Sequence, residues 1–386
     1  MRSIPYATQD INQDDIDAVS EVLKSGWLTQ GPAVPRFEQA VASYCGVSHA
    51  SAVCNATAAL HLACRALGLG AGDALWTSPN TFVASANCAL YCGAGVDFVD
   101  IDARSYNMSV EALRAKLASA EKAGKLPKIV VPVHFSGQPC EMAPIRELAQ
   151  RYDFAVVEDA SHAVGARYRD SRIGDCACSD VAVFSFHPVK ILTTGEGGML
   201  LSKRPNLDAS FKLLRSHGVT RNQALMDAPP HGPWYYQQLE LGYNYRLTDI
   251  QAALGVSQLA RLEDFLARRR AIAARYHEKL AGLPLVLPYQ HPDCHSSWHL
   301  YVIRVPAAKG RSRDQVMAGL RQAGINANVH YIPVHTQPYY RKLGFRHGDF
   351  PQAEAYYAEA ISLPMYYGLS DDDQDTIAER LRALLS

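Results

Sequence analysis

The sequence of 386 residues has no net charge, because 38 lysine and arginine residues balance 38 aspartate and glutamate residues. It has no basic stripe with interleaved aromatic residues, so nothing indicates a nucleic-acid partner. No uncharged apolar run is long enough to span a membrane. Residues 1–10 become polar after Pro5 and lack the pattern of a secretory signal. We therefore expect a cytoplasmic protein that binds neither nucleic acid nor a membrane.

The cysteine pattern indicates neither a disulfide framework nor a metal site. The nine cysteines are an odd number, and most lie in apolar runs, which is typical of reduced, buried thiols. Only Cys176 and Cys178 lie close together, and no second pair completes a zinc site. We expect no bound metal. The length suffices for one large and one small domain.

Short apolar segments alternate with helical segments from residue 50 onward. Strands are predicted at 50–54, 74–77, 96–100, 129–133, 155–157, 181–186 and 198–201, and helices at 58–67, 82–91, 110–123 and 142–152. Helices are also predicted at 13–24 and 37–44. Because these strands are apolar throughout, they predict an α/β fold with a mainly parallel sheet that is covered by helices on both faces.

The pattern changes after Asn244. One long helix is predicted at 249–280, strands at 283–287, 298–305 and 325–331, and helices at 313–323 and 371–385. The run of three arginines at 268–270 is interpreted as a solvated helix face. We expect an N-terminal arm at 1–14 that packs with a small α+β domain at 251–386, and a large cofactor-binding domain at 15–250.

A single lysine, Lys190, lies between two apolar strands, two residues after Pro188. A lysine held among apolar groups loses hydration, so its amine is more easily deprotonated. The neutral amine is the nucleophile that forms Schiff bases with carbonyl compounds. Glycines at 195, 197 and 198 allow the backbone to double back close to the turn. The alternative is a hairpin that carries an ordinary exposed lysine.

Ligands in open α/β sheets bind beyond the carboxyl ends of the strands. Thr57 and Ala58 begin a helix there, where free N–H groups and the helix dipole favour a phosphate. Ser185, at the end of another strand, could reach the same phosphate. The alternatives are a plain N-cap for the helix and a bond from Ser185 to its own backbone.

Other residues at these strand ends suit a flat, nitrogen-containing ring. Asp159 follows three apolar residues and could hold a pyridine nitrogen protonated, or could cap a helix. Phe82 could stack on the ring or pack in a helix core. His162 and His187 are either site residues or structural histidines. An imine-forming lysine, a carboxylate, an aromatic ring and a phosphate site together describe pyridoxal 5'-phosphate.

Several motifs resemble those of the nucleotide-sugar aminotransferases of fold type I over nearly the whole chain. They are Ser185-Phe186-His187 followed by Lys190 and by TTGEGG at 193–198, EDASH at 158–162, NATAALH at 55–61, and GYNYRLT at 242–248. In such enzymes a mainly parallel sheet is flanked by helices and followed by a smaller α+β domain. The resemblance implies a transaminase whose cofactor is pyridoxal 5'-phosphate.

The resemblance also implies roles for individual residues. Lys190 would form the Schiff base with the cofactor and move the proton, Asp159 would pair with the ring nitrogen, and His162 would lie near the ring. Asn244 would reach the cofactor phosphate of a second subunit, which makes the protein a homodimer with shared active sites. The implied cofactor contacts are Lys190, Thr57, Ala58, Phe82, Asp159, His162, Ser185 and Asn244.

Within this family, residues 28–32 and 76–88 are most similar to the aminotransferases of pseudaminic acid synthesis. This implies that L-glutamate donates an amino group to C4 of a UDP-linked 4-keto-6-deoxy-N-acetyl-hexose. A different UDP- or dTDP-keto-sugar is the alternative, and a dehydratase or a non-catalytic protein with the same cofactor is disfavoured because Lys190 and Asp159 are present. The implied substrate contacts are Tyr6, Gly26, Trp27, Leu28, Thr29, Ala56, Ser185, Asn244, His330, Tyr331, Ile332 and Pro333. Arg215, His217 and Arg246 are candidates for the diphosphate or for surface roles.

Overall fold

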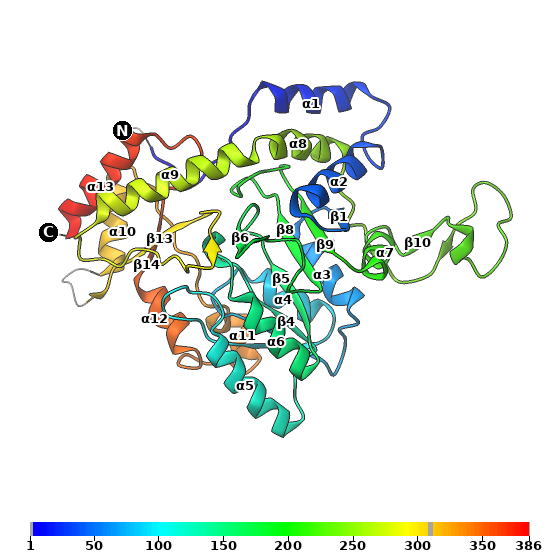
Figure 1. Cartoon of the computed structure of the whole chain (residues 1–386), viewed down its shortest axis with the longest axis horizontal. Helices are drawn as coiled ribbons and strands as arrows, with labels where there is room; N and C mark the ends of the chain where they lie inside the picture. The colour runs from blue at the N-terminus through cyan, green and yellow to red at the C-terminus, as the bar shows by residue number, and fades with distance from the viewer. Residues whose placement is uncertain (1–2, 308–311, 386) are drawn as a thin grey trace.

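The computed structural model describes residues 3–307 and 312–385. A seven-stranded sheet lies at its centre (Figure 1). In spatial order, its strands are β1 (His49–Val53), β9 (Gly198–Ser202), β8 (Val181–Ser185), β5 (Ala155–Asp159), β4 (Ile129–Val131), β2 (Ala74–Thr77) and β3 (Gly95–Phe98). Only β9 runs antiparallel to its neighbours, so the carboxyl ends of the other six strands meet at one edge. The predicted α/β class is confirmed.

Helices cover both faces of this sheet because alternate side chains of each strand enter different cores. One core packs strand residues such as Val157 and Val183 against α3 (Ala56–Ala66), α4 (Ala84–Tyr91) and α7 (Pro205–Leu214). The opposite core packs Val156 and Ala182 against helices on the other face. Those helices are α2 (Ala33–Cys45), α5 (Val110–Ala123), α6 (Met142–Tyr152) and α8 (Asp249–Ala260).

A third core lies around the antiparallel pair β13 (Tyr301–Arg304) and β14 (Ala360–Leu363). Helices α9 (Leu262–Leu280), α10 (Arg313–Gln322) and α13 (Asp371–Leu385) pack on it. Ile4 belongs to this core, and its backbone N–H donates to the carbonyl oxygen of Gly324 at 2.9 Å. The division into 1–14, 15–250 and 251–386 stays a prediction, although the packing of α8 against α1 (Gln13–Lys24) and α2 favours placing α8 with the large sheet.

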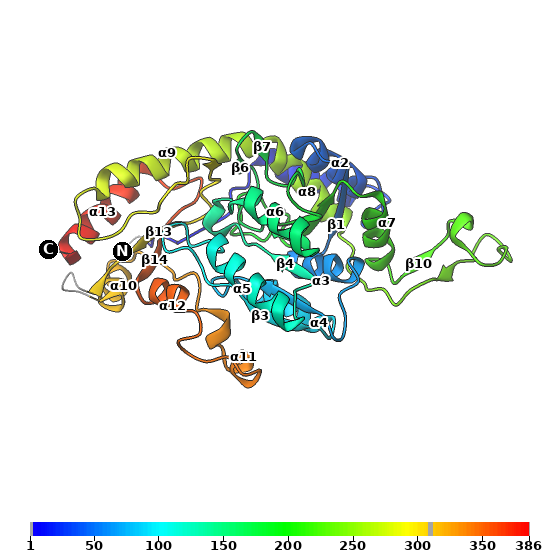
Figure 2. The same ribbon diagram turned by 60° about the horizontal axis from the view of Figure 1, so that its bottom comes forward.

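The remaining elements are short and connect these cores. They are β6 (Arg167–Tyr168), β7 (Ser171–Arg172), β10 (Val219–Thr220), β11 (Gln237–Gln238), β12 (Cys294–His295), α11 (Pro338–Lys342), α12 (Pro351–Glu359) and 3-10 turns at Phe135–Gly137, Gln223–Leu225 and Val334–Thr336. The segment that carries β10 and β11 projects away from the body beyond α7 in both views (Figures 1 and 2). Its Trp234 is 71% exposed. None of the described helices is long and apolar enough to cross a membrane.

Several sequence predictions about these elements were wrong. The segment 249–280 was predicted as a single helix but forms two helices, α8 and α9, which are separated at Arg261. The guanidinium of Arg261 pairs with Asp10 and Asp15. The segments 283–287 and 325–331 form only isolated bridges, because each meets its neighbour through a single residue pair at a time. The arginine run is a solvated face only in part: Arg270 is exposed, whereas Arg269 is buried and donates to three backbone carbonyl groups.

Candidate active site

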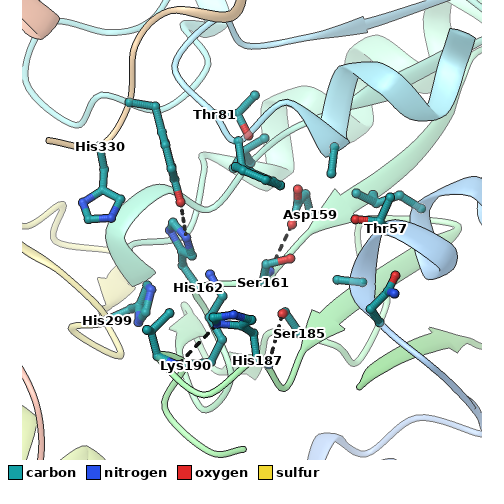
Figure 3. A pocket seen from close by; sticks show the side chains of 18 of the residues that line it. Thr57, Thr81, Asp159, Ser161, His162, Ser185, His187, Lys190, His299 and His330 are labelled. Carbon is teal, nitrogen blue, oxygen red and sulfur yellow. Dashed lines mark hydrogen bonds between the residues drawn. The ribbon is translucent and has the colours of Figure 1, made fainter. Parts of the chain in front are cut away.

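A cavity of about 430 Å³ opens beyond the carboxyl ends of β1, β2, β5 and β8 (Figure 3). Tyr6, His299, His330 and Tyr331 close its other side. It is lined by Tyr6, Asn55, Ala56, Thr57, Leu60, Thr81, Phe82, Ala84, Val133, Asp159, Ser161, His162, Ser185, His187, Val189, Lys190, Glu196, His299, His330 and Tyr331. The fold therefore brings together most of the residues that the sequence singled out.

Lys190 lies in the turn between the antiparallel strands β8 and β9, as the sequence predicted. The turn is fixed from within, because the backbone N–H of Lys190 donates to the carbonyl of His187 at 2.8 Å and that of Thr194 donates to Phe186 at 3.0 Å. The Lys190 amine lies at the wall of the cavity, where protein atoms replace much of the water around it. Desolvation lowers the pKa of Lys190 to about 8, although the nearby Asp159 carboxylate opposes this change. A substantial share of this amine is thus neutral in mildly basic solution.

Asp159 ends β5 and is held by two hydrogen bonds. The Ser85 hydroxyl donates to its Oδ2 atom at 2.6 Å, and the backbone N–H of Ser161 donates to its Oδ1 atom at 3.1 Å. The Thr81 hydroxyl lies 2.8 Å from that of Ser85, one turn away at the start of α4. This chain of hydroxyl groups fixes a buried carboxylate at the cavity wall.

The preceding residue, Glu158, points to the other face of β5. Its Oε2 atom lies 2.7 Å from Nε2 of the buried His134, and it does not line the cavity. Two adjacent carboxylates therefore have different surroundings, as strand alternation requires.

Three histidines and a tyrosine form the opposite wall of the cavity. The Tyr331 hydroxyl lies 3.1 Å from His162 Nε2, and the ring centroids of His162 and His299 are 4.3 Å apart. Desolvation, and then the charge of Lys190, lowers the pKa of His330 to about 4. Burial also lowers the pKa of His162 and His299 well below the usual value. This wall is therefore uncharged at neutral pH.

The start of α3 forms a further part of the wall. Asn55 caps the helix, and its Oδ1 atom accepts the Ala58 N–H at 2.8 Å, so Ala58 itself does not line the cavity. The backbone N–H of Ala58 is therefore used by the N-cap of the helix, which was the alternative to binding a phosphate. Helix geometry leaves the N–H groups of Ala56 and Thr57 without intrahelical partners. Together with the Ser185 hydroxyl, they are suited to an anion.

Gly198 allows strand β9 to lie against this helix start. A Cβ atom at this position would come within 2.6 Å of the Asn55 backbone. Phe82 lies just before α4, which begins at Ala84 and not at 82, and it is 58% exposed at the cavity. The core-packing alternative for Phe82 is therefore excluded.

Some predicted contacts lie outside this cavity. Gly26, Trp27, Leu28 and Thr29 form an exposed loop, Ile332 and Pro333 lead away from Tyr331, and Asn244 is exposed beside Ser216. The roles of these residues stay predictions. Arg215 is not available for a diphosphate, because it pairs with Glu38 and donates to the carbonyl of Ala52.

Sequence reasoning missed Ser85 and His299. Ser85 holds Asp159 from a position 74 residues away in the chain. A signal existed in the spacing of Thr81 and Ser85, which places both hydroxyl groups on one side of a helix start. His299 lies just before β13 and had no recognisable local pattern.

The fold and the cavity define a pyridoxal-phosphate enzyme of fold type I. A lysine follows a strand of a mainly parallel sheet, a buried carboxylate ends the adjacent strand, and an open helix start lies beside them. Comparison with known proteins agrees. The chain belongs to the DegT/DnrJ/EryC1/StrS aminotransferase family, whose model matches residues 9–382.

Relatives and solved structures cover nearly the whole chain. The spore coat polysaccharide biosynthesis protein SpsC of Bacillus subtilis is 41% identical over 99% of this chain and 97% of its own. The putative sugar aminotransferase Spr1654 of Streptococcus pneumoniae, in its PMP form, has a TM-score of 0.91 at 31% identity over 99% of both chains. Helicobacter pylori PseC, an aminotransferase involved in the biosynthesis of pseudoaminic acid, has a TM-score of 0.91 at 29% identity over 100% of this chain and 99% of its own.

These similarities confirm the family, the fold and the cofactor that the sequence predicted. The chain is a pyridoxal-phosphate-dependent aminotransferase of a family that acts on sugars.

Proposed function

We propose that the protein aminates C4 of UDP-2-acetamido-2,6-dideoxy-β-L-arabino-hex-4-ulose. L-glutamate would be the donor, and the product would be UDP-4-amino-4,6-dideoxy-N-acetyl-β-L-altrosamine for pseudaminic acid synthesis in the cytoplasm. One observation carries the reaction type. Lys190 and Asp159 line the same cavity, beside the start of α3, where the first N–H groups have no intrahelical partners. The likeness to PseC over the whole chain supports the substrate.

The residues of the cavity fit pyridoxal 5'-phosphate. Lys190 supplies the amine for its aldehyde, Asp159 the counter-charge for its ring nitrogen, and Phe82 an exposed ring for stacking. The free first-turn N–H groups and the hydroxyls of Thr57 and Ser185 match a phosphate. When bound, the cofactor supplies an electron sink and carries the amino group between donor and acceptor.

Lys190 is the base in this proposal. With its pKa lowered to about 8, the amine can take the proton from the α-carbon of glutamate and return it on the acceptor side. Asp159, held in place by the hydrogen bond from Ser85, would pair with the protonated ring nitrogen. Burial keeps the imidazoles of His162 and His299 in the opposite wall uncharged, so they place no cation opposite the Lys190 amine.

We further propose that the site is completed by a second copy of the chain. Two predicted segments that lie outside their own cavity are adjacent to each other, because Thr29 bridges Thr248 and the backbone N–H of Asp249 donates to the carbonyl of Leu28. Asp249 also accepts the N–H of Gly31 at 2.7 Å. Residues 26–29 thus lie beside the end of the segment 242–248, which carries the exposed Asn244, and both segments are proposed to reach the partner's cavity.

A complementation experiment tests the shared site. Chains with Lys190→Ala and chains with Asn244→Ala are mixed and allowed to exchange subunits. A mixed dimer has one site with both defects and one intact site, so activity should partly return. The control mixture of Lys190→Ala and Asp159→Ala should stay inactive, because each site then keeps one defect. Exchange without recovery in the first mixture contradicts a role for Asn244 in trans.

The substrate is tested with the protein in its aminated form, prepared with L-glutamate and freed of donor. UDP-2-acetamido-2,6-dideoxy-β-L-arabino-hex-4-ulose should remove the absorbance of the aminated cofactor faster than dTDP-linked or epimeric keto-sugars. The 41% identity to SpsC favours a second candidate, a different UDP- or dTDP-keto-sugar of a surface polysaccharide. A faster reaction with one of these would replace the pseudaminic assignment and leave the aminotransferase intact.

A further inference from the structure

Arg269 of α9 is a buried cation that bonds to two separate segments beside the cavity. It is 2% exposed, and its Nη1 atom donates to the carbonyl oxygens of Trp298 at 3.1 Å, His299 at 3.3 Å and Met365 at 3.2 Å. All three acceptors are uncharged, and the Nε atom of Arg269 is buried without a hydrogen-bond partner. Burying a charge is costly, and bonds to carbonyl groups offset only part of that cost. The guanidinium therefore contributes less to stability than its three hydrogen bonds suggest.

The first of these segments carries His299 into the cavity wall. Trp298 has a φ of 51°, a left-handed conformation that a bulky residue rarely adopts unless its surroundings fix it. Arg269 bonds the carbonyl of this residue and that of the next one. On the preceding side, the Ser297 hydroxyl donates to the carbonyl of His162 at 2.8 Å. The turn is thus held from both sides, and the His299 ring lies 4.3 Å from that of His162 between centroids (Figure 3).

The second segment connects Arg269 to the N-terminal part of the chain. The carbonyl of Met365 accepts from Arg269, while its backbone N–H donates to the carbonyl of Tyr6 at 2.9 Å. The Tyr6 ring packs against that of His330, with centroids 5.7 Å apart. Tyr6 and His299 line the same cavity although they come from distant parts of the chain. One guanidinium group therefore connects the backbones that carry both of them.

We propose that Arg269 is a positioning residue for the amino acceptor, which holds Tyr6 and His299 at the spacing that the keto-sugar requires. This inference rests on the proposed function, in which the acceptor lies on that side of the cavity. Burial lowers the pKa of Arg269 to about 10, so the guanidinium stays protonated at neutral pH and keeps all its donors. The turn that carries Lys190 is held by its own backbone bonds and does not depend on Arg269. Loss of the guanidinium should therefore affect the acceptor more than L-glutamate.

The first test separates the two half-reactions of the holoenzyme, each followed by the absorbance of the cofactor and normalised to bound cofactor. In Arg269→Met, the keto-sugar concentration for half-maximal rate should rise about tenfold or more, because misplaced contacts weaken binding, whereas amination by L-glutamate should stay within about threefold of the wild type. The matched control is Arg270→Met, in the next position of the same helix, where the side chain is exposed and neither half-reaction should change. In a His299→Ala background, Arg269→Met should have a smaller effect than in the wild type.

A second measurement does not depend on activity. In the cofactor-free protein, hydrogen–deuterium exchange at the amides of Leu300 and Met365 should be faster in Arg269→Met than in the wild type. The reason is that the Met365 N–H bonds Tyr6, and Leu300 follows the turn that the guanidinium holds. Exchange should not change in Arg270→Met, and exchange in β8 should be the same in all three proteins, which reports an intact fold. If methionine prevents folding, Arg269→Lys is measured in the same way and should show the same pattern to a smaller degree.

Two results would overturn the proposal. Equal losses in both half-reactions, or a loss in neither, would show that Arg269 does not act on the acceptor side. Unchanged exchange at Met365 would show that it does not hold the segment bonded to Tyr6. The acceptor in these tests is the keto-sugar that reacts fastest with the aminated wild type. A wild type that prefers a sugar other than the proposed one therefore contradicts the proposed substrate and leaves the test of Arg269 in force.

Discussion

Replacing Lys190 by methionine should stabilise the cofactor-free protein in neutral solution. The side chain keeps its length but loses an ammonium group that is poorly solvated in the cavity. The pKa of Lys190 falls from its ordinary value of 10.5 to about 8 on folding. At about 1.4 kcal/mol per pH unit, this corresponds to a cost of at most about 3 kcal/mol to the folded state.

The size of the effect depends on pH, whereas its sign does not change. Below pH 8 the amine is protonated in both the folded and the unfolded chain, so the full cost is present. Between pH 8 and pH 10.5 the folded state is neutral while the unfolded state still binds the proton, so the cost shrinks and then vanishes. The advantage of Lys190→Met over the wild type should therefore be largest at pH 7 and much smaller at pH 10.

The assay is chemical denaturation of the cofactor-free proteins at these two pH values. Lys203→Met is the matched control, because Lys203 is exposed and its replacement should change the free energy of unfolding by less than about 0.5 kcal/mol. If Lys190→Met is no more stable than the wild type at pH 7, or if its advantage does not depend on pH, the desolvation of this amine is refuted.

Three further predictions concern the same cavity. Borohydride should fix the cofactor on Lys190, and label on Lys203 or Lys212, found by peptide mapping, would contradict the assignment. Asp159→Ala should lose far more transamination than Glu158→Ala, because only Asp159 lines the cavity, and equal, mild losses in steady-state rates would remove the role in holding the ring nitrogen. Ser85→Ala should lower kcat about tenfold or more, since a hydrogen bond to a charged group contributes about 1.5–3 kcal/mol, and Ser85→Thr should restore part of it.

The sequence predicted which residues line one side of the cavity because that side consists of strand ends, and their roles toward the cofactor stay predictions. Lys190, Asp159, Ser185 and Thr57 each follow an apolar strand, and the parallel arrangement alone brings such positions to one edge. Recognising the strands was enough to predict that these residues lie together, whereas their chemical roles depended on the family resemblance.

Local sequence patterns did not predict the features that depend on contacts between distant segments. Arg269 lies in a run that reads as solvated, yet three carbonyl groups from distant segments satisfy it in the interior. The helix at 249–280 breaks at Arg261 because this residue pairs with Asp10 and Asp15, about 250 residues earlier. Local propensity favours a continuous helix there and contains no signal of those partners.

The two sides of the cavity have different structural origins. Strand ends and the start of α3 surround the proposed cofactor position, and all of them belong to one closely packed sheet. The proposed acceptor side is assembled from Tyr6 in the N-terminal segment and from His330 and Tyr331, which follow α10 in the chain. These three residues contact one another, because the ring centroids of Tyr6 and His330 are 5.7 Å apart and those of His330 and Tyr331 are 5.0 Å apart. Under the proposed function, substitutions at Tyr6 or His330 would change the contacts to the sugar while the hydrogen bonds that hold Asp159 stay in place.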